Sequence, residues 1–191
     1  MYSRPPDLQA TLDLMCRAVS ADPGRSADTE RALAIVEERL RRWPENGSRA
    51  DQPARLPVCA VLEDALAPKG PLLEALRAIE PQLVWTRRKG NLGDDRFRAR
   101  HANAMLVGPE GVESRDDLQI GVSLMAPDTD YPVHHHPPEE IYLVLSDGEW
   151  WNEADGWYRP GFGGTVYHRP NQRHAMRAGA KPLLALWALP I

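Results

Sequence analysis

Two short stretches of this sequence gather side chains that bind metal ions. Residues 131–148 read YPVHHHPPEEIYLVLSDG, and residues 164–178 read GTVYHRPNQRHAMRA. Neutral imidazole nitrogens and carboxylate oxygens bind transition metals, and an incomplete shell of such donors leaves a coordination position for a substrate. We therefore predict a working site for one divalent transition metal: zinc, iron, manganese or nickel. The ligands that we expect are His134, His136, Glu140 and His174.

The spacing in the first stretch groups these donors on one face of the chain. Successive side chains of an extended strand point to opposite faces, so His134 and His136 share a face. Further along, Glu140 shares a face with Tyr142, which adds a phenol to the cluster. His174 would come from a second strand. The opposite face of this strand is apolar, and helices could pack against it. It carries Ile141, Leu143 and Leu145.

The histidine run by itself also fits a solvated loop. Glu140 and the distant PNQRH segment favour the metal centre, because each adds a donor at a suitable spacing. His135 lies between two expected ligands and should face away from them, and Glu139 should be a solvated neighbour. We expect neither His101 nor His168 at the site, because neither has a matching spacing.

The first half of the chain must supply the helices. Apolar residues recur there at three- and four-residue steps, which is typical of amphipathic helices. Pro23 and Gly24 separate the first two helices, and Pro44 ends the second. The charged, glycine-containing segment 87–100 is expected to be a loop. The helical segments that we predict are Leu8 to Val19, Ser26 to Leu40, Val61 to Leu66 and Leu72 to Ile79.

After about residue 103 the pattern changes to short apolar runs separated by Gly, Pro, Asp and Asn. Such runs are typical of an antiparallel sandwich or barrel. We predict a mainly β fold with an N-terminal helical layer. Residues 1–100 would form a helical region packed on the barrel, and residues 101–191 would form the barrel that carries the metal site.

Composition narrows the class of protein further. A chain of 191 residues with 42% hydrophobic content can bury one sizeable core. The net charge is −4 and the basic residues are scattered, so we expect no nucleic-acid partner. The N-terminus has no continuous apolar run, so we expect neither a signal peptide nor a membrane contact. Cys16 and Cys59 suit small core positions in a reducing compartment, which favours the cytoplasm.

The two stretches resemble the two motifs of the cupin superfamily. The first motif, G-x5-H-x-H-x3-4-E-x6-G, is matched at its ligand positions by His134, His136 and Glu140. Gly148 comes one position late, and no glycine stands at the leading position. The resemblance implies a double-stranded β-helix, also called a jelly roll.

The second cupin motif, G-x5-P-x-G-x2-H-x3-N, is matched by Gly164, Pro170 and His174. Gln172 stands where glycine is usual, the histidine comes one residue early, and no asparagine closes the motif. These departures put the exact turn geometry in doubt and leave the metal assignment in place.

A narrower pattern, Y-x2-H-x-H-x3-E-x-Y followed by G-x5-P-x3-H, is similar to the dimethylsulfoniopropionate (DMSP) lyases of the DddQ type. The likeness covers residues 118–189, and the helical segment agrees in general layout. It implies β-elimination of dimethyl sulfide from DMSP, which leaves acrylate. It also implies Tyr142 as the catalytic base and Tyr131 as a residue that helps to hold the substrate. The matching residues are Tyr131, His134, His136, Glu140, Tyr142, Pro170 and His174.

In such a reaction the metal would bind the substrate carboxylate and stabilise the negative charge that develops there. A phenol with a pKa of about 10 is a poor base, but a nearby divalent cation favours its phenolate. A sulfonium has no hydrogen-bond donor, so aromatic faces suit it best. The candidate walls are Tyr131, Trp150, Trp151 and Trp187, although the three tryptophans also suit core packing.

Two other functions remain open at this point. A cupin dioxygenase or isomerase acting on another small molecule would use the same ligands without Tyr142 as base. A cupin sensor or binding module would use the metal or its ligand to regulate a partner. The sequence also leaves open whether the helices form a lid, a homodimer interface or only a cover.

Overall fold

The computed structural model describes residues 3–42, 52–90 and 92–191. The helices are α1 (Pro6–Ala21), α2 (Ala27–Leu40), η1 (Pro57–Val61), α3 (Leu62–Ala65), α4 (Pro71–Ile79), η2 (Glu80–Gln82) and α5 (Asp95–Arg100). The strands are β1 (Trp85–Thr86), β2 (His101–Val107), β3 (Leu118–Met125), β4 (Asp130–His134), β5 (Glu140–Val144), β6 (Glu149–Asn152), β7 (Gly156–Tyr158), β8 (Thr165–His168), β9 (His174–Arg177) and β10 (Leu183–Pro190).

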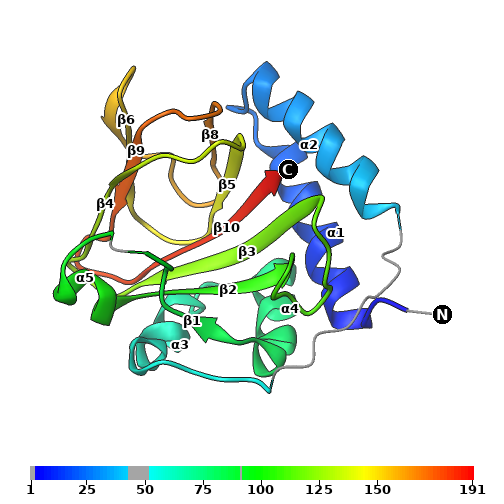
Figure 1. The fold of residues 1–191 in the computed structure, drawn as a ribbon, viewed down its shortest axis with the longest axis horizontal. Coiled ribbons are helices and arrows are strands. Elements are labelled where there is room, and N and C mark those ends of the chain that lie inside the picture. The colour runs from blue at the N-terminus through cyan, green and yellow to red at the C-terminus, as the bar shows by residue number, and fades with distance from the viewer. Residues whose placement is uncertain (1–2, 43–51, 91) are drawn as a thin grey trace.

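The strands form two sheets. The larger has the order β1-β2-β3-β10-β5-β8, and the smaller has the order β4-β9-β6-β7. All neighbouring strands within them run antiparallel. Figure 1 shows α1 and α2 on one side of the larger sheet and β4, β6 and β9 on the other. This confirms the predicted mainly β, cupin-type barrel with an N-terminal helical layer.

The larger sheet is apolar on both faces, and its outer face carries the helices. Ile141 and Leu143 of β5 belong to the same buried cluster as Leu12 of α1 and Leu33 of α2. This confirms the expected apolar outer face of β5. Ser26 starts α2 as predicted, because its side chain accepts a hydrogen bond from the backbone N–H of Thr29. The expected end of α2 at Pro44 lies outside the described residues.

The inner face of the larger sheet carries the second buried cluster, which fills the barrel. Alternate residues of β5 and β10 point inward, among them Tyr142 and Trp187, and these two residues are cross-strand partners. On the other side Trp187 pairs with Gly121 of β3. A Cβ on Gly121 would lie 2.3 Å from Cζ2 of Trp187, so only glycine leaves room for the indole.

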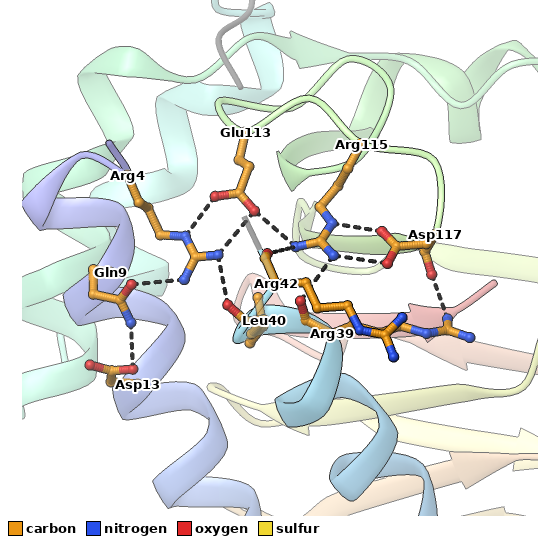
Figure 2. A network of polar contacts seen from close by, with 9 residues as sticks. All are labelled: Arg4, Gln9, Asp13, Arg39, Leu40, Arg42, Glu113, Arg115 and Asp117. Atoms are coloured by element: carbon orange, nitrogen blue, oxygen red, sulfur yellow. Dashed lines mark hydrogen bonds and ion pairs between the residues drawn. The ribbon is translucent and has the colours of Figure 1, made fainter. Parts of the chain in front are cut away.

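A buried polar network fastens the helical layer to the barrel (Figure 2). Glu113, in the connection between β2 and β3, accepts hydrogen bonds from Arg4, which precedes α1, and from Arg115. Arg4 also donates to the carbonyl of Leu40 at the end of α2, and Arg115 donates to that of Arg39. Glu113 and its two arginine partners therefore join three segments that are far apart in the sequence.

Two expectations need adjustment, and one remains untested. The segment 87–100 is not entirely loop, because α5 occupies its end. Asp94 caps this helix by accepting a hydrogen bond from Phe97, whose ring is buried. Glu139 is not a solvated neighbour: Arg31 of α2 and Tyr167 of β8 both donate to its carboxylate. The division at residues 100 and 101 stays a prediction; β1 pairs with β2 across it.

Cys16 and Cys59 are buried and unpaired, as expected of core residues. Within the described residues, no helix has the length and apolar character that crossing a membrane requires.

Candidate metal and active site

Three imidazoles meet at one end of the small sheet. His134 ends β4 and His174 begins β9, and the two are register partners. His136 follows β4 in the loop that leads to β5, while His135 between them is exposed. One ligand nitrogen from each of His134, His136 and His174 lies within 4.8 Å of the others. The structure therefore brings together donors from two stretches that are separated by about forty residues in the sequence.

Backbone carbonyls orient all three rings. The Nδ1 atoms of His134, His136 and His174 lie 3.0, 2.9 and 2.8 Å from the carbonyl oxygens of residues 132, 138 and 172. A carbonyl accepts only from a protonated Nδ1, so Nε2 is left as the metal-binding nitrogen of each ring. This is the arrangement of histidines that bind metal ions.

Glu140 of β5 completes the cluster. Its Oε2 lies 3.0 Å from Nε2 of His136 and 3.4 Å from Nε2 of His174. Burial by itself would raise the pKa of Glu140, but its contacts with these two imidazoles lower it well below the usual range. The same carboxylate raises the pKa of His136 against the effect of burial. Without a metal, a proton shared by His136 and Glu140 balances the negative charge of the carboxylate. A bound cation would balance that charge in its place.

The donor set fits a transition metal. Nε2 of His174 is buried and makes no hydrogen bond in the described part of the chain, although Oε2 of Glu140 lies 3.4 Å from it. Burial and the neighbouring His174 lower the pKa of His134 to about 3, so this ring stays neutral, as a ligand must be. Three imidazoles, which bind metals in their neutral form, and one carboxylate make four donors. Such a set is typical of a catalytic rather than a structural metal site.

Both tyrosines of the sequence pattern border the same cavity. It has a volume of about 670 Å³, and Tyr131, Tyr142, His134, His136 and Glu140 lie in its wall. Tyr142 is 4% exposed, and burial together with Glu140 raises its pKa well above the ordinary value. The phenol is therefore protonated unless a nearby positive charge opposes these effects.

Tyr131 of β4 is surrounded by rings and by one cation. Its ring centroid lies 4.6 Å from that of His134 and 4.8 Å from those of Phe97 and His101. Arg88 donates to its hydroxyl at 2.9 Å. Burial raises the pKa of Tyr131 to about 12, although Arg88 acts in the opposite direction. Tyr131 is therefore a neutral hydrogen-bonding group at the edge of the histidine cluster.

The structure separates the three candidate tryptophans. Trp187 lies in the cavity wall. Trp150 is 1% exposed and packs its ring 6.3 Å from that of Tyr142, behind the wall rather than in it. Trp151 points to the other face of β6, where Trp157 is its strand partner, and is also absent from the wall. Of the three, only Trp187 is brought to the cavity wall. Neighbouring residues of β6 face opposite ways, which is why Trp150 and Trp151 have different surroundings.

Two histidines that we did not expect at the site lie next to it. His168 of β8 is the strand partner of Glu140 and stacks on His174, with ring centroids 4.1 Å apart. It is fully buried, and burial followed by His174 lowers its pKa to about 3. The ring of His101 in β2 contacts that of Tyr131, and its Nε2 donates to Oδ1 of Asn103. Spacing could not reveal these contacts, because they depend on the pairing of β5 with β8 and on the packing of the two sheets against each other.

Comparisons with known proteins identify the family of this chain. The sequence profile of the DMSP lyase family matches residues 29–185. DMSP lyase DddQ of Ruegeria pomeroyi is 32% identical over 141 residues, which cover 70% of each chain. The crystal structure of DMSP lyase DddQ from Ruegeria pomeroyi DSS-3 aligns with a TM-score of 0.74 and 26% identity, over 98% of this chain and 93% of that one.

A second solved structure gives the same result. A chain from the crystal structures of DMSP lyases RdDddP and RnDddQII has a TM-score of 0.68 and 28% identity, over 97% of this chain and 92% of that one. The similarity thus extends through the helical layer as well as the barrel. By sequence and by structure, the protein is a lyase that belongs to the dimethylsulfoniopropionate lyase family.

Proposed function

We propose that this protein cleaves DMSP to dimethyl sulfide and acrylate by β-elimination, with Tyr142 as the base. The observation that carries the proposal is that Tyr142 borders the same cavity as His134, His136 and Glu140, in a chain of this family. A cavity of about 670 Å³ admits a molecule of this size together with water.

The reaction couples a proton transfer to a bond cleavage on the next carbon. The base takes a proton from the carbon beside the carboxylate, and the electron pair left behind forms the carbon–carbon double bond. The carbon–sulfur bond breaks, and its electrons leave on sulfur as dimethyl sulfide. The proton rests on Oη of Tyr142 until solvent accepts it. Negative charge grows on the carboxylate during this step, so groups that stabilise it lower the barrier.

The ligands that we propose for the metal are His134, His136, Glu140 and His174. A divalent ion held there would supply a position for the substrate carboxylate and a positive charge that favours the phenolate of Tyr142. The chain provides what this requires: Tyr142 is two residues beyond Glu140 on the same face of β5, and both are buried. Imidazole and carboxylate donors accept zinc, iron, manganese and nickel alike.

Aromatic faces would hold the sulfonium. Trp187 and Tyr131 both border the cavity, and an aromatic face attracts a cation by about 0.5–2 kcal/mol. We assign the sulfonium to Trp187 and a supporting role to Tyr131. Trp150 supports the site from behind Tyr142 in this proposal, and Trp151 has no contact with the substrate.

We also propose a cytoplasmic location, on the ground that Cys16 and Cys59 are buried as free thiols. A homodimer stays a prediction, which the size of the purified protein in solution would test.

Detection of dimethyl sulfide in the headspace above the metal-loaded protein tests the proposal. Wild-type protein should release dimethyl sulfide and acrylate from DMSP without dioxygen, and removal of the metal by a chelator should stop release. Tyr142→Phe should lower release by about 10²–10⁴-fold, the usual contribution of a general base, while metal content is unchanged. The control is Tyr167→Phe, because Tyr167 donates to Glu139 on the helix-facing side of β8.

Near-normal release by Tyr142→Phe would show that another group is the base. Turnover that requires dioxygen would favour the cupin dioxygenase instead.

A further inference from the structure

The cavity wall holds a guanidinium whose charge no carboxylate of the described chain balances. Arg88 borders the cavity together with Tyr131, His134 and Glu140. Its Nη1 donates to the hydroxyl of Tyr131 at 2.9 Å. Within residues 3–42, 52–90 and 92–191, this is the hydrogen bond that Arg88 makes, and it forms no ion pair there.

One edge of the guanidinium is left without acceptors. Nε of Arg88 is shielded from solvent and has no hydrogen-bond partner among the described residues. Nη2 likewise makes no hydrogen bond within that part of the chain. A buried N–H without an acceptor is unfavourable, because water no longer solvates it. Nε and Nη2 point the same way, and together they match the two oxygens of a carboxylate.

In two other arginines of this protein, the same edge of the guanidinium, formed by Nε and Nη2, binds a carboxylate. Nε and Nη2 of Arg4 lie 2.6 and 3.0 Å from the two carboxylate oxygens of Glu113. The same two atoms of Arg115 lie 2.7 and 2.8 Å from those of Asp117 (Figure 2). Arg88 offers an equivalent pair of donors, and the described residues supply no carboxylate to it.

The two side-chain carboxylates that border the cavity, Glu110 and Glu140, already have partners. Glu140 contacts His136 and His174, and Glu110 pairs with Lys89. A carboxylate ligand that enters the cavity can therefore supply the acceptors that this edge of Arg88 lacks. Two parallel N–H donors beside a full positive charge select a carboxylate over a neutral group.

We propose that Arg88 binds the carboxylate of the substrate through this edge and thereby orients the substrate in the cavity, an inference that rests on the proposed lyase function. Each carboxylate oxygen has two lone pairs, so both oxygens can accept from Arg88 while one of them also faces the metal ligands. The sulfonium end is repelled by the guanidinium. Arg88 already lies 5.7 Å from the ring centroid of Tyr131, so the sulfonium lies toward Trp187.

Binding of the two halves of the substrate tests this orientation. Acrylate carries the carboxylate without a sulfonium, and trimethylsulfonium carries the sulfonium without a carboxylate. Affinities are measured by calorimetry with metal-loaded and metal-free protein. Arg88→Met should weaken acrylate binding about 10–100-fold, as expected for a lost charge-assisted pair of hydrogen bonds. Its affinity for trimethylsulfonium should stay within about twofold of wild type or improve, because a like charge is removed.

Steady-state kinetics of DMSP cleavage gives an independent measurement. Arg88→Met should raise KM more than it lowers kcat, and Arg88→Lys should restore the affinity only in part, because an ammonium lacks the two-pronged edge. The matched control is Arg87→Met, an exposed neighbour on the same cavity wall, which should stay within about twofold of wild type. Circular dichroism verifies that each variant is folded.

Unchanged acrylate affinity in Arg88→Met would overturn the inference. So would a Tyr131→Phe variant that reproduces the whole loss and to which Arg88→Met adds nothing, because Arg88 would then act only by holding Tyr131. If wild type releases no dimethyl sulfide but Arg88→Met still loses acrylate binding, the lyase proposal fails and the carboxylate site stands. If wild type releases dimethyl sulfide and Arg88→Met has the KM of wild type, the lyase proposal stands and the carboxylate site at Arg88 fails.

Discussion

Replacing Glu113 with glutamine should destabilise the whole protein, because one buried carboxylate serves two buried guanidinium groups. Its side chain is 0% exposed, and those of Arg4 and Arg115 are 2% and 6% exposed. Oε2 lies 2.6 Å from Nε of Arg4, and Oε1 lies 3.1 Å from Nη1 of Arg115. Glutamine keeps the shape of the side chain and removes its charge, so the buried positive charges lose a shared counter-charge (Figure 2).

The expected loss is large for a chain of this size. Removing one partner of a buried ion pair costs about 3–5 kcal/mol, because the remaining charge stays buried. A domain of this length loses about 2–4 °C of Tm for each kcal/mol, so Tm should fall by about 6–20 °C. Folded domains are stable by only about 5–15 kcal/mol, so a loss of this size removes a large part of that free energy.

Urea unfolding followed by tryptophan fluorescence and by circular dichroism measures the loss. Glu113→Gln should lower the midpoint without changing the slope, because the same surface is exposed on unfolding. The control is Asp147→Asn, which breaks the solvent-exposed contact between Asp147 and Arg159 and should change stability little. A loss below about 1 kcal/mol in Glu113→Gln would refute the reasoning, since it would mean that the network is not held by this charge.

Two further predictions concern Trp187 and Asp22. Gly121→Ala should destabilise the protein by about 1–3 kcal/mol and shift its tryptophan fluorescence, because the new Cβ would lie 2.3 Å from the indole of Trp187. The control is Gly179→Ala, because a Cβ there would have nothing within 4 Å. Equal Tm values for the two variants would contradict the prediction. Burial would raise the pKa of Asp22, but hydrogen bonds from Thr165 and Gly24 lower it. The ionised side chain therefore stabilises the fold fully above the unfolded pKa of about 4, and this contribution is lost as pH falls through the lower folded pKa. Urea unfolding should show a deficit of about 1–2 kcal/mol for Asp22→Asn at pH 7 that shrinks below about pH 4, and a pH-independent deficit would disprove the assignment.

Local periodicity explains which features were predictable from sequence. A helix repeats every 3.6 residues and a strand every two, so each pattern is visible within ten residues. The helices begin and end near the predicted residues for this reason, and the alternation along β5 separates Ile141 and Leu143 from Glu140 and Tyr142 as expected. The short helix α5 was missed because its one buried apolar side chain, Phe97, gives no periodic pattern.

By itself, then, the sequence determined the donor types, the fold class and the face on which Glu140 and Tyr142 lie, because all three follow from residue type and strand parity. Only the tertiary structure decided that Trp187 rather than Trp150 borders the cavity, that His168 stacks on His174, and that Arg88 meets Tyr131. Each of those arrangements depends on how segments that are distant in the sequence pack against one another. Such long-range packing depends on the whole core, so no local spacing of residues in the sequence predicts it.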